Sequence, residues 1–102
     1  MIYRAIRGTD GKVRLFRGGT EILPEASQKV RNHSPTGFEF GYAGSGPSQT
    51  ALAILLDVVG EQKALALYQN FKMAFIAQAQ ESFEIEEESI KAWIRLFETA
   101  SN

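Results

Sequence analysis

The segment of residues 38–56 reads F-E-F-G-Y-A-G-S-G-P-S-Q-T-A-L-A-I-L-L and organises the rest of the chain. Its first five residues alternate apolar with polar or small side chains, which predicts a strand over residues 38–42 with three aromatic rings on one face. A glycine-rich turn follows, and Pro47 suits the first position of a helix whose cap is Gly46 or Ser45. Apolar residues cover most of the circumference of that helix, so we expect it to be buried nearly all round.

Length and composition predict a single soluble domain. The chain has 102 residues, the usual size of one domain, and its 44% hydrophobic and 23% charged residues match ordinary globular proteins. It has no cysteine, so disulfide and thiol chemistry are excluded, and its N-terminus lacks the apolar stretch of a signal peptide. No apolar run reaches the roughly 18 residues that a membrane span requires. We therefore expect a cytoplasmic protein without a membrane segment.

The N-terminal part predicts a β-hairpin. Residues 2–7 and 13–17 are rich in β-branched and aromatic side chains, and Asp10-Gly11 between them is a strong hairpin signal. Neither run alternates cleanly between apolar and polar residues, so the face that is buried stays open. Residues 20–23 are compatible with one more short extended piece.

The rest of the chain predicts helices and one short extended segment. Residues 24–33 suit a weak helix or an irregular loop, whereas residues 61–79, after the helix stop at Gly60, suit a second helix antiparallel to the first. Residues 83–85 alternate as a brief extended piece, and a third helix follows with the apolar stripe Ile90, Trp93, Ile94 and Phe97. We predict an α+β fold with a small antiparallel sheet, the hairpin plus the 38–42 strand, packed against a three-helix C-terminal part.

Charge is distributed unevenly along the chain. The first 43 residues carry seven Lys or Arg against four Asp or Glu, and the remaining 59 carry four against eight. Either the two halves pack together and neutralise each other, or a basic face meets a polyanion. On the predicted hairpin, basic side chains lie beside Tyr3 and Phe16, a combination that suits nucleic acid; the candidate residues are Arg4, Arg7, Arg14 and Arg17. A pI near 5.8 and the lack of a recognised nucleic-acid motif make this the alternative function.

The turn of residues 41–49 is the main candidate site. A strand, a glycine-rich turn and a helix N-terminus can hold a phosphate or carboxylate, because the first backbone N–H groups of a helix have no partner within it. The turn matches neither the phosphate-loop pattern nor G-x-G-x-x-G, and Pro47 removes one N–H group. A purely structural role for the glycines is therefore the alternative. The candidate ligand- or partner-binding residues are His33, Glu39, Tyr42, Gly44, Ser45, Ser48 and Gln49.

A small enzyme is the second alternative. His33, Glu39 and Ser45 are the residue types that a nucleophilic site requires, but Ser45 does not lie in a G-x-S-x-G elbow. One histidine and no cysteine leave only carboxylates for a metal, and the glutamates within residues 84–88 lack the spacing of a calcium loop. We therefore predict no catalytic residue, no cofactor and no metal.

Residues 36–49, T-G-F-E-F-G-Y-A-G-S-G-P-S-Q, resemble the signature T-G-F-E-W-G-Y-G-G-S-G-P-A-Q-L-A-L-A of a family known only as a domain of unknown function. Its members are small bacterial, archaeal and mobile-element proteins, and the resemblance extends over residues 33–56, 64–72 and 83–94. The chain departs from the signature at Phe40, Ala43, Ser48 and Thr50, and Ala43 argues against a role that needs a positive φ there. The resemblance implies an association with phages or plasmids and assigns no activity, cofactor or catalytic residue.

The function predicted from these observations is that of a non-catalytic binding module that uses the turn of residues 41–49. Its partner is expected to be an unidentified protein or a small anionic ligand, with nucleic acid as the alternative. The apolar helices offer more hydrophobic surface than a small domain readily buries, which also allows a homodimer.

Overall fold

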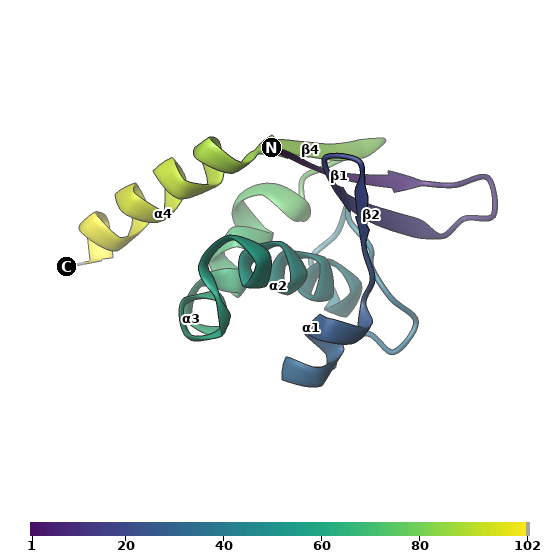
Figure 1. The fold of residues 1–102 in the computed structure, drawn as a ribbon, viewed down its shortest axis with the longest axis horizontal. Helices are drawn as coiled ribbons and strands as arrows, with labels where there is room; N and C mark the ends of the chain where they lie inside the picture. The colour runs from purple at the N-terminus through teal and green to yellow at the C-terminus, as the bar shows by residue number, and fades with distance from the viewer. Residues whose placement is uncertain (102) are drawn as a thin grey trace.

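Asp10 and Gly11 form the turn of the predicted hairpin, which the computed structural model confirms. β1 (Ile2–Arg7) and β2 (Val13–Arg17) pair antiparallel, and Gly11 adopts a positive φ of 81° in the turn. The structure describes residues 1–101, and the side chains of residues 1–100. Within them, a four-stranded antiparallel sheet packs on helices that lie on one of its faces, an α+β architecture (Figure 1).

The sheet has the strand order β3-β2-β1-β4, where β3 is Thr20–Ile22 and β4 is Ser82–Glu86. The short extended pieces predicted at residues 20–23 and 83–85 therefore form strands. β4, near the end of the chain, pairs antiparallel with β1 at its start, with Ala5 opposite Phe83. The two chain halves are joined through this pairing.

The prediction that residues 38–42 form the third strand is wrong. Only Phe38 pairs with the sheet, through an isolated bridge to Val13. The next residue, Glu39, does not pair with a strand, because its backbone groups bind the Thr50 hydroxyl. This hydroxyl accepts a hydrogen bond from Glu39 N (3.0 Å) and donates one to Glu39 O (2.7 Å). Gly41 then turns the chain with a φ of 93°. The segment is extended but is held by a helix side chain.

One face of the hairpin is buried, which the sequence left open. Tyr3, Ala5, Val13 and Leu15 point toward the helices and are buried. The opposite face carries Arg4 and the half-exposed Ile2 and Ile6 and has no helix over it (Figure 1). An antiparallel sheet can leave one face to solvent in this way.

The helices begin close to the predicted positions. α1 (Glu25–Val30) is short, with Pro24 as its N-cap, and α2 (Ser45–Val59) has Gly44 as its N-cap. The prediction that Pro47 is the first residue of α2 is therefore wrong: it is the third. Its missing N–H costs nothing there, because the first four N–H groups of a helix have no internal partner. All residues from 46 to 55 are buried, as predicted for this helix.

α3 (Glu61–Phe71) and the segment after it pack on α2, and the last helix contacts them through Trp93. α3 follows Gly60, whose φ is 83°, and continues as the π-helical segment η1 (Lys72–Ile76), three residues short of the predicted end. α4 (Glu87–Ser101) extends away from the sheet (Figure 1), and the ring of Trp93 lies 5.6 Å from that of Phe71. Among residues 1–101, no helix combines the length and apolarity that crossing a membrane requires.

Candidate functional site

Gln49, one of the predicted binding residues, is fully buried in the first turns of α2. Its Oε1 accepts hydrogen bonds from His33 N (2.7 Å) and Ser34 N (3.0 Å), and its Nε2 donates to Ser27 Oγ (2.9 Å) and Arg31 O (3.1 Å). A glutamine amide has two donors and two acceptor positions, so its capacity is used entirely within the fold. Gln49 fastens the chain after α1 to α2.

Glu39, a second predicted binding residue, also has partners within the fold. Its carboxylate accepts two hydrogen bonds from Arg7, at 3.0 and 2.8 Å, and this guanidinium holds the pKa of Glu39 below its ordinary value. The Arg7 guanidinium also lies 5.1 Å from the centre of the Phe40 ring. This ion pair joins the end of β1 to the segment that leads into the glycine-rich turn.

Ser48 lies below the turn and is buried. Its hydroxyl is 3.2 Å from Gly44 O and 3.2 Å from Gln69 Oε1, and it can donate its single proton to either. On the other side of the turn, Gly41 N donates to Ile76 O (3.0 Å). The turn is thus held at one end by Ser48 of α2 and at the other by η1.

The glycines of the turn are required by close approach. A Cβ on Gly44 would lie 2.4 Å from Cε2 of the Tyr42 ring, and a Cβ on Gly46 would lie 2.6 Å from Cβ of Glu39. The Tyr42 ring therefore rests on the backbone of the turn, yet Tyr42 is 52% exposed. Ser45 is exposed as well. These two side chains are the outward part of the predicted site.

Two of the candidate enzyme residues have hydrogen-bond partners other than one another. His33 Nε2 lies 2.6 Å from the Tyr68 hydroxyl, whereas Glu39 binds Arg7. In the part of the chain that the structure describes, no hydrogen bond joins any two of His33, Glu39 and Ser45. The described residues also contain no group of three or more His, Asp or Glu side chains that could hold a metal.

The four arginines of the hairpin divide between its two faces. Arg4 and Arg14 lie on the open face, and Arg7 and Arg17 on the face toward the helices, as the strand register requires. Three of them are paired with carboxylates: Arg7 with Glu39, Arg14 with Asp10, and Arg17 with Asp57 and Glu87. The guanidinium of Arg4 lies 5.8 Å from the Phe16 ring. The four side chains thus form no common basic face.

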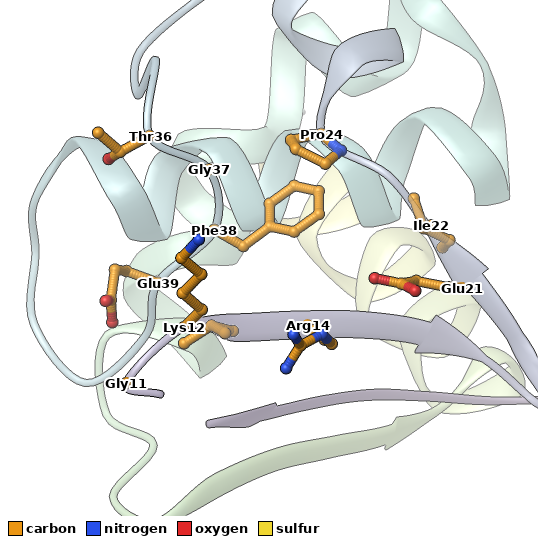
Figure 2. A pocket seen from close by; sticks show the side chains of 11 residues that line it. Gly11, Lys12, Arg14, Glu21, Ile22, Pro24, Thr36, Gly37, Phe38 and Glu39 are labelled. Carbon is orange, nitrogen blue, oxygen red and sulfur yellow. The ribbon is translucent and has the colours of Figure 1, made fainter. Parts of the chain in front are cut away.

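A cleft of about 350 Å³ lies beside the hairpin and was not predicted. It opens where the edge of β2 is covered first by β3 and then by Phe38, because Ile22 pairs with Leu15 and Phe38 with Val13. Figure 2 shows the Phe38 ring turned toward Pro24, with charged side chains around the opening; these are Lys12, Arg14, Glu21 and Glu39. The residues that line the cleft come from three separate segments, 11–14, 21–24 and 36–39, so no pattern within one short stretch of sequence predicts it.

Comparison with known proteins gives one match. The model of a family of unknown function (DUF6166) matches residues 3–96. No curated protein matches the chain, and no solved structure does. The family match includes every strand, the glycine-rich turn and most of α4. The chain therefore belongs to the family of unknown function DUF6166.

Proposed function

We propose that the chain is a non-catalytic binding module that presents the turn of residues 41–45 to a protein partner. The observation that carries this proposal is Tyr42, a large aromatic side chain that is 52% exposed on a turn held by buried hydrogen bonds. Exposed tyrosines in rigid surroundings are frequent anchors of protein interfaces, because they bury a large area at a low entropy cost.

The rigidity of the turn supports this function. Ser48 holds Gly44 O from α2, and Gly41 N is bonded to Ile76 O. Thr50 holds Glu39, the residue that leads into the turn. A turn ordered before binding loses little conformational freedom when a partner docks, and this raises affinity. The polar residues predicted at this site thus divide into those that hold the turn and those that face outward, Tyr42 and Ser45.

A protein partner fits better than a small molecule here. The cleft in Figure 2 is lined by Glu39 but not by Tyr42 or Ser45. Small ligands generally occupy concave sites that cover most of their surface, whereas a projecting aromatic residue suits a pocket on another protein.

Photo-crosslinking tests the proposal. The photoreactive residue p-benzoylphenylalanine is placed at position 42 of the full chain and, as a matched control, at position 96, where Leu96 is 72% exposed on α4. In cells of the native host, we expect a discrete adduct from position 42 that is absent from position 96. No adduct from position 42, or the same adducts from both positions, would contradict the proposal.

The cellular setting is part of the same proposal. A cytoplasmic location is part of the proposal, and the lack of cysteine in these 102 residues supports it. The resemblance of residues 36–49 to a signature of small prokaryotic and mobile-element proteins supports a partner of phage or plasmid origin. Fractionation of host cells, followed by sequencing of the crosslinked partner, tests both statements.

A further inference from the structure

A basic cluster lies on the side of the molecule where the chain after α1 meets α3, and we define it as Arg31, His33, Tyr68 and Lys72. His33 Nε2 lies 2.6 Å from the Tyr68 hydroxyl, and Arg31 Nη1 lies 3.4 Å from the same oxygen. Lys72 follows Tyr68 by four residues and so lies near it on the helix surface. Burial lowers the pKa of the His33 imidazole, and the positive charges of Arg31 and Lys72 lower it further.

The hydrogen bonds within the cluster leave only donor groups without a partner. Arg31 can only donate, so the Tyr68 oxygen accepts from it, and the Tyr68 hydroxyl proton is free for His33 Nε2. His33 is then neutral with its proton on Nδ1, in agreement with its lowered pKa. The groups that remain for a ligand are His33 Nδ1–H, the other N–H groups of Arg31 and the ammonium group of Lys72.

The positive charge of the cluster is not balanced within the fold. Neither Arg31 nor Lys72 forms an ion pair with any described carboxylate, whereas five other Lys and Arg side chains do. No acidic group is among the causes of the His33 pKa shift. Two uncompensated positive charges therefore act on the same small area.

We propose that the basic cluster binds a phosphate monoester. A monoester carries a charge of about −1.5 to −2 at pH 7, close to the two uncompensated charges, whereas a carboxylate would neutralise only one of them. Its three terminal oxygens match donors that arrive from three side chains, and a planar guanidinium is well suited to bind two of those oxygens. The site uses neither Tyr42 nor Ser45 and does not depend on the proposed function of the turn.

Titration followed by two-dimensional ¹H–¹⁵N NMR tests the proposal. Phenyl phosphate is added to the full chain at pH 7 and constant ionic strength, with phenylacetate as the carboxylate of matched shape. We expect saturable shifts confined to the amides of residues 31–34 and 68–72, a higher pKa of His33 in the complex, and weaker binding of phenylacetate. Inorganic phosphate and a phosphoserine peptide, tested in parallel, show whether a free anion or a phosphorylated protein is the better source of the group.

Two double variants with the same net charge distinguish binding at the basic cluster from general electrostatic attraction of the anion. The variant Arg31→Gln with Lys72→Gln removes both positive charges of the cluster, and we expect it to bind phenyl phosphate about tenfold more weakly or worse. The control Lys29→Gln with Arg95→Gln removes two exposed charges outside the cluster and should bind as the wild type does. If the first variant does not fold, Lys72→Gln alone serves, since no side-chain contact of Lys72 holds the fold.

Three results would overturn the proposal. They are shifts of the wild type that stay linear in phosphate concentration, equal affinities of the cluster variant and its control, and equal affinities for phenyl phosphate and phenylacetate.

Discussion

Gln49 is a polar residue in a position where a hydrophobic residue would be expected from burial alone. Its amide satisfies two backbone N–H groups and one backbone carbonyl on the segment after α1, and one hydroxyl, that of Ser27, within α1. Buried polar groups that lose their partner are costly, because water cannot replace it. At the residue scale, this amide is what fixes the path of the chain that carries Arg31 and His33.

The first prediction concerns this amide. Gln49→Leu is expected to lower the free energy of unfolding by about 3 kcal/mol, because it leaves several buried polar groups unpaired. The control Gln62→Leu replaces an exposed glutamine on α3 and should change the free energy of unfolding by less than about 0.5 kcal/mol. Urea denaturation measures both values. Equal losses of unfolding free energy in the two variants would show that the hydrogen bonds of the buried amide do not stabilise the fold.

The second prediction compares two glycines of the turn. Gly46→Ala brings a Cβ against the Cβ of Glu39, which is held by Arg7 and Thr50, so we expect a loss of about 2 kcal/mol of stability. Gly44→Ala meets only the exposed Tyr42 ring, which can swing away, so we expect a loss below about 0.5 kcal/mol. Thermal unfolding measures both.

The variant Gly44→Ala also tests the proposed function. In the chain with p-benzoylphenylalanine at position 42, Gly44→Ala is expected to displace the ring at that position and remove the crosslinked adduct while the fold is kept. Retention of the adduct in this variant would mean that the orientation of Tyr42 on the turn is unimportant.

At the scale of elements, the sheet and α2 are tied by a hydrogen bond from the Tyr3 hydroxyl on β1 to Asp57 Oδ2 at 2.5 Å. Arg17 on β2 lies 3.1 Å from the same carboxylate oxygen and also pairs with Glu87 at the start of α4. The two strands of the hairpin therefore meet α2 at one carboxylate, and Arg17 extends the network to α4. This network sets where α2 ends relative to the sheet.

The third prediction concerns this tie. Tyr3→Phe keeps the packing of the ring but removes the hydrogen bond, and should lower the free energy of unfolding by about 1 to 2 kcal/mol. Burial, followed by Asp57, raises the pKa of Tyr3 in the folded state. The unfolded chain thus releases this proton first, so wild-type stability should fall as pH rises above 10.

The measurement for the third prediction is the difference in stability between wild type and Tyr3→Phe from pH 8 to 11. This difference should shrink as the pH passes 10, the ordinary pKa of tyrosine. A constant difference over that range would contradict the tie to Asp57.

At the scale of the whole molecule, several groups with shifted pKa values affect stability, and His33 and Glu39 titrate in separate ranges. The pKa values of Asp10, beside Lys12 and Arg14, and of Glu87, beside Lys91, are also lowered, in the acid range where Glu39 titrates. His33 has a folded pKa below its usual value of 6.5, owing to burial and then to Arg31 and Lys72. Glu39 has a folded pKa below its usual value of 4.5, owing chiefly to Arg7. In both cases the unfolded chain binds protons more readily, so each contribution to stability is complete above the usual pKa and is lost as pH falls below it.

The fourth prediction is that the free energy of unfolding falls between pH 7.5 and 5.5 because of His33, and falls again below about pH 4.5 because of Glu39. His33→Gln should flatten the first decline and leave the second. Denaturation at a series of pH values checks this. A first decline that persists in His33→Gln would assign it to another group.

Much of the fold could be predicted from local patterns. The hairpin follows from Asp10-Gly11 between two β-rich runs, and the helices follow from apolar periodicity with stops at residues such as Gly60. The predicted strand at residues 38–42 failed because its alternation is real but its hydrogen-bonding partner is the Thr50 side chain. Periodicity reports which face of a segment is buried and does not report what its backbone binds.

The sequence by itself determined the α+β class, the buried α2 helix and the position of the glycine-rich turn, because each depends on residues within a few positions of one another. Only the tertiary structure decided that β4 completes the sheet, that Gln49 fastens the chain after α1 to α2, that Arg7 binds Glu39, and that Arg31, His33, Tyr68 and Lys72 meet. These contacts join segments up to about 80 residues apart. Their geometry depends on how separate elements pack around one core, which no short stretch of sequence specifies.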